Sequence, residues 1–182
     1  MQILSHLIRS PALTGAVAPS SQFLARAMAD AAQGAGHIVE LGAGTGAVTR
    51  ALAHRDPDAA LTLVELQPAL ARRLARSFPQ ARVIAQPAAW VLDGFEGDLA
   101  AAAPASPPAA AEGGSGRIAL VSSLPFRSLP PAVHGQTRRA ILDFLARHPG
   151  SWLVQFTYAP RAPFEAAAGF RWTRGRTIVA NI

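Results

Sequence analysis

The sequence predicts an α/β fold, in which a mostly parallel sheet carries helices on both faces. Two patterns predict it. Short apolar runs alternate with segments of helical pattern, and a glycine-rich turn joins the first of these runs to a helix. The 182 residues fit one domain, 1–182, with a sizeable core, and the 50% apolar content excludes a disordered chain.

The first half of the chain reads as β-α-β-α-β after one leading helix. Ser20 or Ser21 can cap that leading helix, and Pro68 suits the first position of a later one. We expect helices at 22–32, 45–54 and 68–77, and strands at 37–41, 61–66 and 81–85.

The second half continues the alternation after an interruption. Residues 100–116 are rich in Ala, Pro and Gly and predict a flexible surface insertion. We then expect a strand at 117–122, a turn at 123–126, a helix at 132–147, a strand at 152–158 and a closing hairpin formed by 170–173 and 176–181. A hairpin there makes one late strand antiparallel.

The first residues have amphipathic character. Within residues 1–13, Ile3, Leu4, Leu7 and Ile8 fall on one helical face. Such a helix could lie in a membrane interface or could cover part of the core, and the sequence favours neither use.

The stretch 39–46, Val-Glu-Leu-Gly-Ala-Gly-Thr-Gly, carries the most chemical information. Gly42, Gly44 and Gly46 predict a tight turn where a ligand can approach the backbone at a helix N-terminus. Glycines at this spacing also fit a dinucleotide fingerprint, so they do not identify the ligand alone.

Two acids narrow the choice of ligand. Glu65 follows a second apolar run, where an acid can accept hydrogen bonds from ribose hydroxyls, as it also does in NAD proteins. Glu40 directly precedes the glycines, where an anion repels a pyrophosphate and suits a ligand with an amine or sulfonium cation.

Composition limits the partners and the chemistry. There are 17 basic residues, all arginine, and 11 acids, and the net charge of +6 favours an anionic partner unless it only reflects a high-GC genome. The chain has no cysteine, and its five histidines are scattered, so thiol chemistry is excluded and no metal site is expected.

No apolar run is long enough to span a bilayer, and the N-terminus does not resemble a signal peptide. We expect a cytoplasmic protein, either soluble or peripheral at the inner membrane.

Four stretches together resemble a known family. They are the glycine turn, residues 15–21, Ser122-Ser-Leu-Pro-Phe126, and Val154-Gln-Phe-Thr-Tyr-Ala-Pro160. The chain resembles class I methyltransferases that use S-adenosylmethionine (SAM), and in particular bacterial phospholipid N-methyltransferases, near the ribosomal RNA adenine dimethylase branch. The resemblance implies a Rossmann-like, seven-stranded sheet with a C-terminal antiparallel hairpin.

The resemblance also implies roles for residues. The implied SAM contacts are Ser20, Ser21, Glu40, Gly42, Ala43, Gly44, Thr45, Gly46, Glu65, Leu66, Gln86, Pro87 and Ser122. Gln86 stands where the family usually has an Asp for the adenine amino group. The implied catalytic residues are Ser122, Ser123 and Tyr158, and the implied substrate contacts are Leu124, Pro125, Phe126, Arg127, Tyr158 and Arg161.

The implied reaction transfers the methyl group of SAM to the amine of phosphatidylethanolamine or a related lipid, at a membrane surface with anionic lipids. Two alternatives remain: methylation of adenine N6 in RNA, and a SAM-binding fold without catalysis. A nucleic-acid partner is less favoured, because the chain has no room for an additional RNA-binding domain. The oligomeric state is left open.

Overall fold

The computed structural model describes residues 22–95, 117–157 and 162–173. Its centre is a parallel sheet with the strand order β3-β2-β1-β4-β5. The strands are β1 His37–Leu41, β2 Ala60–Val64, β3 Arg82–Ile84, β4 Ile118–Ser122 and β5 Trp152–Gln155. All four pairings are parallel, as the β-α alternation predicts.

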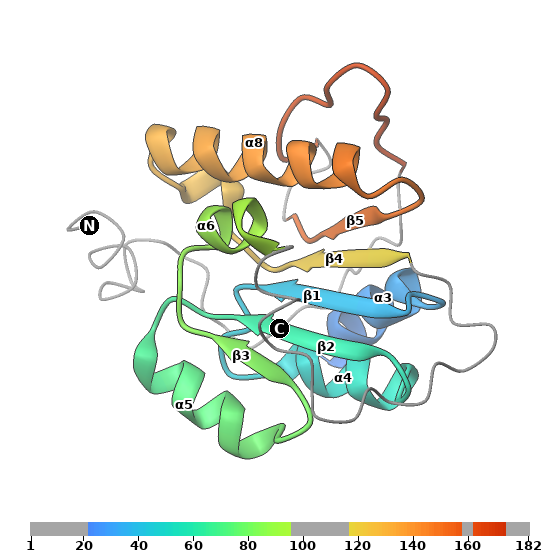
Figure 1. Cartoon of the computed structure of the whole chain (residues 1–182), viewed down its shortest axis with the longest axis vertical. Helices are drawn as coiled ribbons and strands as arrows, with labels where there is room; N and C mark the ends of the chain where they lie inside the picture. Colours follow the sequence, from blue (N-terminus) through green and yellow to red (C-terminus); the bar gives the residue numbers. More distant parts are fainter. Residues whose placement is uncertain (1–21, 96–116, 158–161, 174–182) are drawn as a thin grey trace.

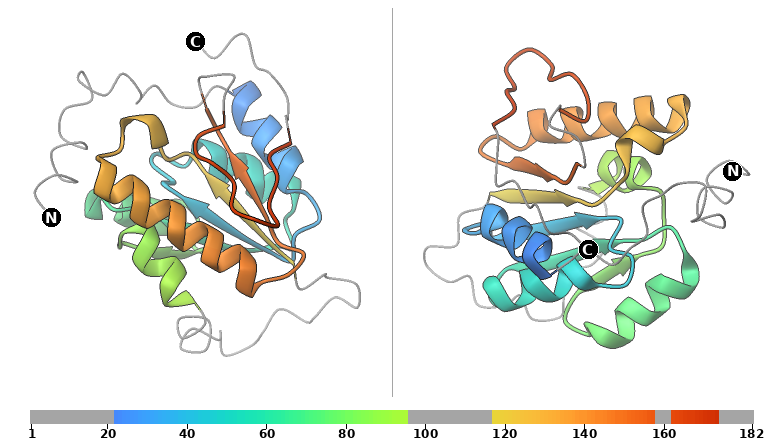
Figure 2. Two further views of the ribbon diagram at one scale, coloured as in Figure 1. Left: turned by 90° about the horizontal axis from the view of Figure 1, so that it is seen from above. Right: turned by 180° about the vertical axis from the view of Figure 1, so that it is seen from behind.

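The helices lie on both faces of this sheet (Figure 1, Figure 2). Helices α3 and α4 pack on one face, α6 and α8 cover the other, and α5 lies beside β3 at the sheet edge. Their bounds are α3 Gln22–Ala32, α4 Ala47–Arg55, α5 Pro68–Ser77, α6 Ala88–Asp93 and α8 Pro131–Arg147, with a short 3₁₀ helix, η1, at Phe126–Ser128.

Alternation along the strands divides the core into two layers. On β1, Ile38 packs with α3 and α4, whereas Val39 and Leu41 pack with α6 and α8. Burial of these apolar side chains on both faces explains why the strands read as nearly continuous apolar runs.

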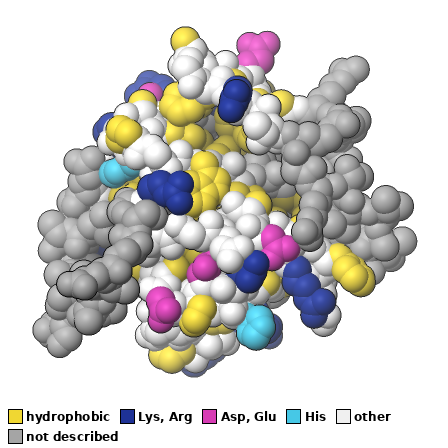
Figure 3. All heavy atoms as spheres, turned by 90° about the vertical axis from the view of Figure 1, so that its right-hand side faces the viewer, with side chains coloured by type: hydrophobic (Ala, Val, Ile, Leu, Met, Phe, Trp, Pro, Cys, Tyr) yellow, Lys and Arg dark blue, Asp and Glu magenta, His cyan; other side chains and the backbone are white. Residues whose placement is uncertain are grey.

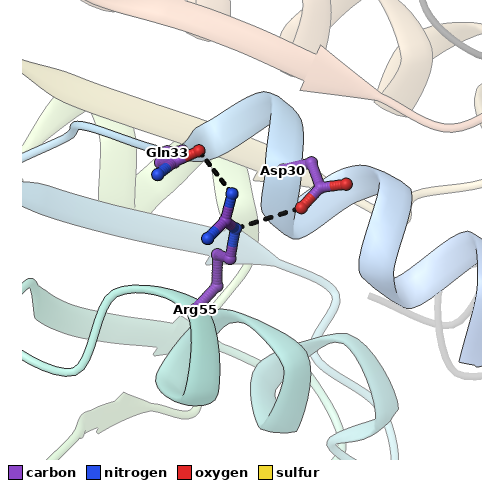
Figure 4. A network of polar contacts seen from close by, with 3 residues as sticks. All are labelled: Asp30, Gln33 and Arg55. Carbon is purple, nitrogen blue, oxygen red and sulfur yellow. Dashed lines mark hydrogen bonds and ion pairs between the residues drawn. The ribbon is translucent and has the colours of Figure 1, made fainter.

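A polar contact ties α3 to α4. The guanidinium of Arg55 donates to Asp30 Oδ1 at 3.1 Å and to Gln33 Oε1 at 2.7 Å (Figure 4). Because this pair is exposed, it adds only about 0–1 kcal/mol, and the two helices are held mainly by their apolar contacts.

Several expectations about local structure were wrong. The strand expected at 61–66 is β2, which ends at Val64, and residues 156–157 of the strand expected at 152–158 form no strand. The helix after the glycine turn begins at Ala47 and not at Thr45, because Gly46 has a φ of 83°, which is left-handed. Residues 88–93 form α6, which the sequence did not predict.

The five described strands do not test the predicted seven-stranded sheet in full. Residues 170–173 form no strand within the described part of the chain, and the second run of the predicted hairpin, 176–181, lies outside it. The predicted segments 1–13 and 100–116 also lie outside the described residues.

Candidate functional site

The candidate site lies where the strand order reverses. β1 has β2 on one side and β4 on the other, so the chain leaves β1 and β4 toward opposite halves of the sheet. Ligands of open α/β sheets bind outside the carboxyl ends of the strands at such a reversal. The glycine turn follows β1 at this point, and Ser123-Leu-Pro-Phe126 follows β4, whose last residue is Ser122.

Two backbone hydrogen bonds hold the glycine turn against the end of β2. The amides of Gly42 and Ala43 donate to the Val64 carbonyl at 2.8 and 3.2 Å. A Cβ on Gly46 would lie 2.8 Å from Phe78 Cε2, so the closely packed core beneath the turn requires glycine there. Ala43 is buried in the same small cluster, while Thr45 is exposed.

Glu65 closes the turn from the β2 side. Its Oε2 accepts a 2.8 Å hydrogen bond from the amide of Gly44, and its Oε1 accepts one of 2.8 Å from Gln67. Each carboxylate oxygen has a second lone pair. The acid therefore fixes the turn and still has acceptor capacity for a ligand hydroxyl.

Glu40 lies on the α4 side of the sheet and is completely buried. Its Oε2 accepts a 2.6 Å hydrogen bond from Thr49 Oγ1, on the first turn of α4. Its Oε1 is also shielded from water and has no hydrogen-bond partner in the described part of the chain. Burial raises the pKa of Glu40 to about 8, with the hydrogen bond from Thr49 opposing the shift and the nearby Glu65 carboxylate adding to it. A cationic or hydrogen-bond-donating ligand group would satisfy this oxygen.

The loop after β4 lies directly against the glycine turn. A Cβ on Gly42 would lie 2.9 Å from Leu124 Cδ2, so the Leu124 side chain covers the turn. The amide of Ser123 donates to the Leu41 carbonyl at 3.1 Å. The predicted cofactor turn and the predicted substrate loop are therefore neighbours in space.

The remaining residues of that loop differ in exposure. Ser122 is fully buried, and its Oγ accepts a 3.3 Å hydrogen bond from the amide of Leu124. Phe126 is 3% exposed and packs against Phe164 and His134 within the α8 layer. Pro125 precedes η1, and Arg127 is exposed within it.

The far end of the site is formed by the turns after β2 and β3. Leu66 is partly buried next to Glu65, and Pro87 is the residue before α6. Gln86 is exposed at the same edge of the sheet. Ser20, Ser21, Tyr158 and Arg161 lie outside the described residues.

Two polar residues of the site were not singled out from the sequence. Thr49 is the hydroxyl partner of Glu40, and Gln155 ends β5 and reaches the Leu124 carbonyl. The sequence offered two signals for them. Thr49 is a hydroxyl residue at the third position of a helix, and Gln155 is an amide residue at the end of a strand.

An apolar cavity of about 400 Å³ lies between β5 and α8. It is bounded by α8, β5 and residues 164–173, and Gln155 is one of its lining residues. It is not the space in front of the glycine turn, because its lining includes no residue of 42–46.

Among the described residues, no group of three or more His, Cys, Asp or Glu side chains is arranged to hold a metal ion. No described helix is both long and apolar enough to cross a membrane.

No family model matches the chain, and no curated protein matches it. Among solved structures, 23S rRNA methyltransferase ErmE matches at 24% identity and a TM-score of 0.42, over 72% of this chain and 44% of that one. The sugar N-methyltransferase KedS8 from a Streptoalloteichus species matches at 18% identity and a TM-score of 0.46, over 84% of this chain and 52% of that one. The chain thus spans about half the length of these two proteins, and the similarity is one of fold only.

Proposed function

We propose that this protein is a SAM-dependent N-methyltransferase. The observation that carries the proposal is Glu40 Oε1, a buried acceptor to which no described residue donates. It lies behind a glycine turn whose other side is bonded by Glu65. A pyrophosphate ligand would bring negative charge to this carboxyl group, whereas SAM brings an ammonium and a sulfonium. Glu40 can ionise beside an ammonium but not beside a pyrophosphate, so the pocket favours SAM over a dinucleotide.

The residues of the pocket fit the parts of SAM. Glu40 would compensate the ammonium of the methionine part of SAM. The space in front of Gly44 is open to a ligand, because the nearest protein atom to a Cβ placed there would be the Gly42 carbonyl oxygen, at 3.9 Å. Glu65 would accept hydrogen bonds from the ribose hydroxyls, and Gln86 would accept one from the adenine amino group.

When bound, SAM supplies a methyl group on a sulfonium, which is already a good leaving group. The neutral form of the substrate amine would be the nucleophile, and S-adenosylhomocysteine would leave with the electron pair of the broken C–S bond. The ammonium form of the amine would first have to lose a proton to water. The protein's part is to position the amine and to exclude water.

For the methyl acceptor, we propose the amine of phosphatidylethanolamine or a related lipid headgroup. Three features support it: the sequence resemblance, the arginine-based net charge of +6, and two large exposed aromatic side chains, Phe23 (63% exposed) and Trp90 (57% exposed). Such side chains favour a membrane interface, and positive charge favours anionic lipids. The described part of the face in Figure 3 mixes arginine, acidic and hydrophobic side chains.

The resemblance further implies two more strands beside β5. The outer edge of β5 pairs with no other strand of the described sheet, so two further strands could pair there.

The same fold could serve an RNA adenine methyltransferase, and the net charge is compatible with that acceptor.

Calorimetry and labelling test the proposal. The protein should bind S-adenosylhomocysteine and should not bind NAD. It should transfer labelled methyl groups from SAM to vesicles of anionic lipid with phosphatidylethanolamine. Label in total RNA would support the alternative acceptor, and binding of NAD alone would reject the proposal.

A variant of Glu65 tests whether this residue binds the ribose of the cofactor. Glu65→Ala removes the ribose acceptor and frees the amide of Gly44, so we expect at least about a tenfold weaker affinity for S-adenosylhomocysteine. Asp58→Ala, which removes an exposed acid, is the control and should bind like the wild type. Equal affinity of Glu65→Ala and wild type would mean that the ribose contact is misassigned.

A further inference from the structure

We propose that the arginine face of α5 is the surface by which this protein docks on a bilayer of anionic lipids. The face consists of Arg72, Arg73 and Arg76. The inference rests on the proposed lipid acceptor, because an enzyme for a headgroup amine has to reach its substrate at a membrane surface. It adds to that proposal the part of the molecule that makes the contact.

Helical periodicity places the three arginines side by side. Arg76 is four positions after Arg72 and three after Arg73, and these are the spacings of neighbours on a helix surface. The other side of α5 is apolar: Ala71 and Leu74 are buried, and Leu74 belongs to a core cluster. The core contacts of α5 thus leave the three arginines on its solvent side, where all three are exposed.

No acid of the described structure neutralises these charges. Among the described residues, none of the three arginines makes an ion pair or a side-chain hydrogen bond. Between Glu65 and Asp93 the chain has four arginines and no acidic residue, so this segment itself supplies no carboxylate. Like charges at helical spacing repel each other and destabilise the helix. An anionic partner would remove this repulsion.

The position of α5 lets it meet a flat surface. It lies beside β3, which is the last strand on its side of the described sheet, and it forms the lower end of the described structure in Figure 1. Its first residue, Pro68, follows Gln67, whose amide donates to Glu65 Oε1. A bilayer docked against α5 would therefore lie next to the ribose end of the proposed SAM site.

The composition of this surface favours a bilayer over RNA. Surfaces that bind single-stranded RNA combine basic residues with exposed aromatic side chains on which bases stack. The one aromatic residue within 66–85 is Phe78, and it is buried in the core. An anionic bilayer needs only positive charge near its surface, which the arginine face supplies. The face therefore fits anionic lipid headgroups, whose phosphates the guanidinium groups can bind.

Sedimentation with sucrose-loaded vesicles tests the inference on the 182-residue chain. One type of vesicle contains phosphatidylethanolamine, phosphatidylcholine and the anionic phosphatidylglycerol, and the other type lacks phosphatidylglycerol. The test variant combines Arg72→Gln, Arg73→Gln and Arg76→Gln, because glutamine has nearly the helix propensity of arginine. The assay measures binding without SAM, so it does not depend on catalysis.

A control variant removes the same charge from other surfaces. It combines Arg26→Gln on α3, Arg139→Gln on α8 and Arg171→Gln in residues 162–173, all at exposed positions. Thermal unfolding should occur close to the wild-type temperature in both variants, because every substituted side chain is exposed. Differences in vesicle binding then report on the surface and not on folding.

Wild type should bind the anionic vesicles much more tightly than the neutral ones. The test variant should bind the anionic vesicles about a hundredfold more weakly than wild type, because three charges next to the bilayer are lost. The control variant should bind within about fivefold of wild type, because charges farther than a Debye length from the bilayer are screened.

Several outcomes would overturn this inference and leave the proposed methyl transfer standing. Equal losses in the test and control variants would show that only the net charge matters. Wild-type binding in the test variant would show that α5 does not touch the bilayer, and a loss of its affinity for total RNA alone would assign the face to nucleic acid. Conversely, wild type that binds anionic vesicles through the arginine face but transfers no methyl group to their lipid would overturn the proposed acceptor alone.

Discussion

Thr49 Oγ1 donates a 2.6 Å hydrogen bond to Glu40 Oε2, in the interior between α4 and β1. This bond satisfies one oxygen of a fully buried carboxyl group and leaves the other without a partner in the described structure. Burial of this group raises its pKa to about 8. Ionisation of Glu40 is thus unfavourable in the unliganded protein, and a bound cation would favour it.

Glu40→Gln should stabilise the unliganded protein and weaken ligand binding. The pKa of Glu40 rises from 4.5 to about 8 on folding, so its contribution to stability is full below 4.5 and is lost as the pH rises through about 8. Glutamine mimics the protonated acid at every pH. The difference in free energy of unfolding between Glu40→Gln and wild type should therefore grow by up to about 1.4 kcal/mol per pH unit in this window. Thermal or denaturant unfolding between about pH 5 and about pH 9 measures it. Parallel stability curves for the two proteins would contradict the prediction.

Uptake of a cationic ligand should release a proton from Glu40. At neutral pH the group is mostly protonated without ligand, because its pKa is about 8, and an ammonium placed at Oε1 would favour the carboxylate. Calorimetric titration with S-adenosylhomocysteine in two buffers of different ionisation enthalpy measures the proton count. We expect release of close to one proton for the wild type and none for Glu40→Gln. Equal counts for both proteins would rule out Glu40 as the source.

Gly46→Ala should destabilise the protein by about 2–5 kcal/mol. The residue has a φ of 83°, and its new Cβ would lie 2.8 Å from Phe78 Cε2 and 3.1 Å from Leu74 Cδ2. Gly135→Ala is the matched control, because it lies in α8 with nothing within 4 Å of the new Cβ and should stabilise the helix by about 0.5–1 kcal/mol. Urea unfolding of both variants measures the difference. A change of the same sign in both would refute the packing argument.

Protonation of His37 should destabilise the protein in mild acid. Its burial and, to a lesser extent, the charge of Arg82 lower the pKa of His37 from 6.5 to about 4. The unfolded chain therefore binds more protons between these values, and stability should fall by up to about 3 kcal/mol as the pH drops from about 6.5 to about 4. His37→Gln should flatten this part of the curve, whereas His54→Gln, at an exposed site, should keep the wild-type slope. An unchanged slope in His37→Gln would assign the acid sensitivity to other groups.

Much of the secondary structure could be predicted from local patterns. The helices at 22–32 and 68–77 and the strand at 37–41 have the predicted bounds. Helix α6 could not be found in this way, because its six residues are too few to show a helical period. Its buried Val91 and Leu92 are held by the α8 layer, which is a tertiary effect.

The cofactor pocket was largely visible in the sequence, and the substrate loop was only partly so. Glu40, the glycines and Glu65 are signalled by their place after apolar runs, and the structure brings Glu65 within 2.8 Å of the Gly44 amide. The place of Phe126 in the core and the bond from Gln155 to Leu124 depend on residues 30 or more positions apart, which no local pattern links.

The sequence by itself determined the parallel α/β arrangement and the acid-glycine-acid order of the pocket, because strand periodicity, helix starts and turns are written over a few consecutive residues. Only the tertiary structure decided which oxygens of the pocket have donors. That property depends on the distances between side chains from β1, α4, β4 and β5, and packing of the whole core fixes those distances.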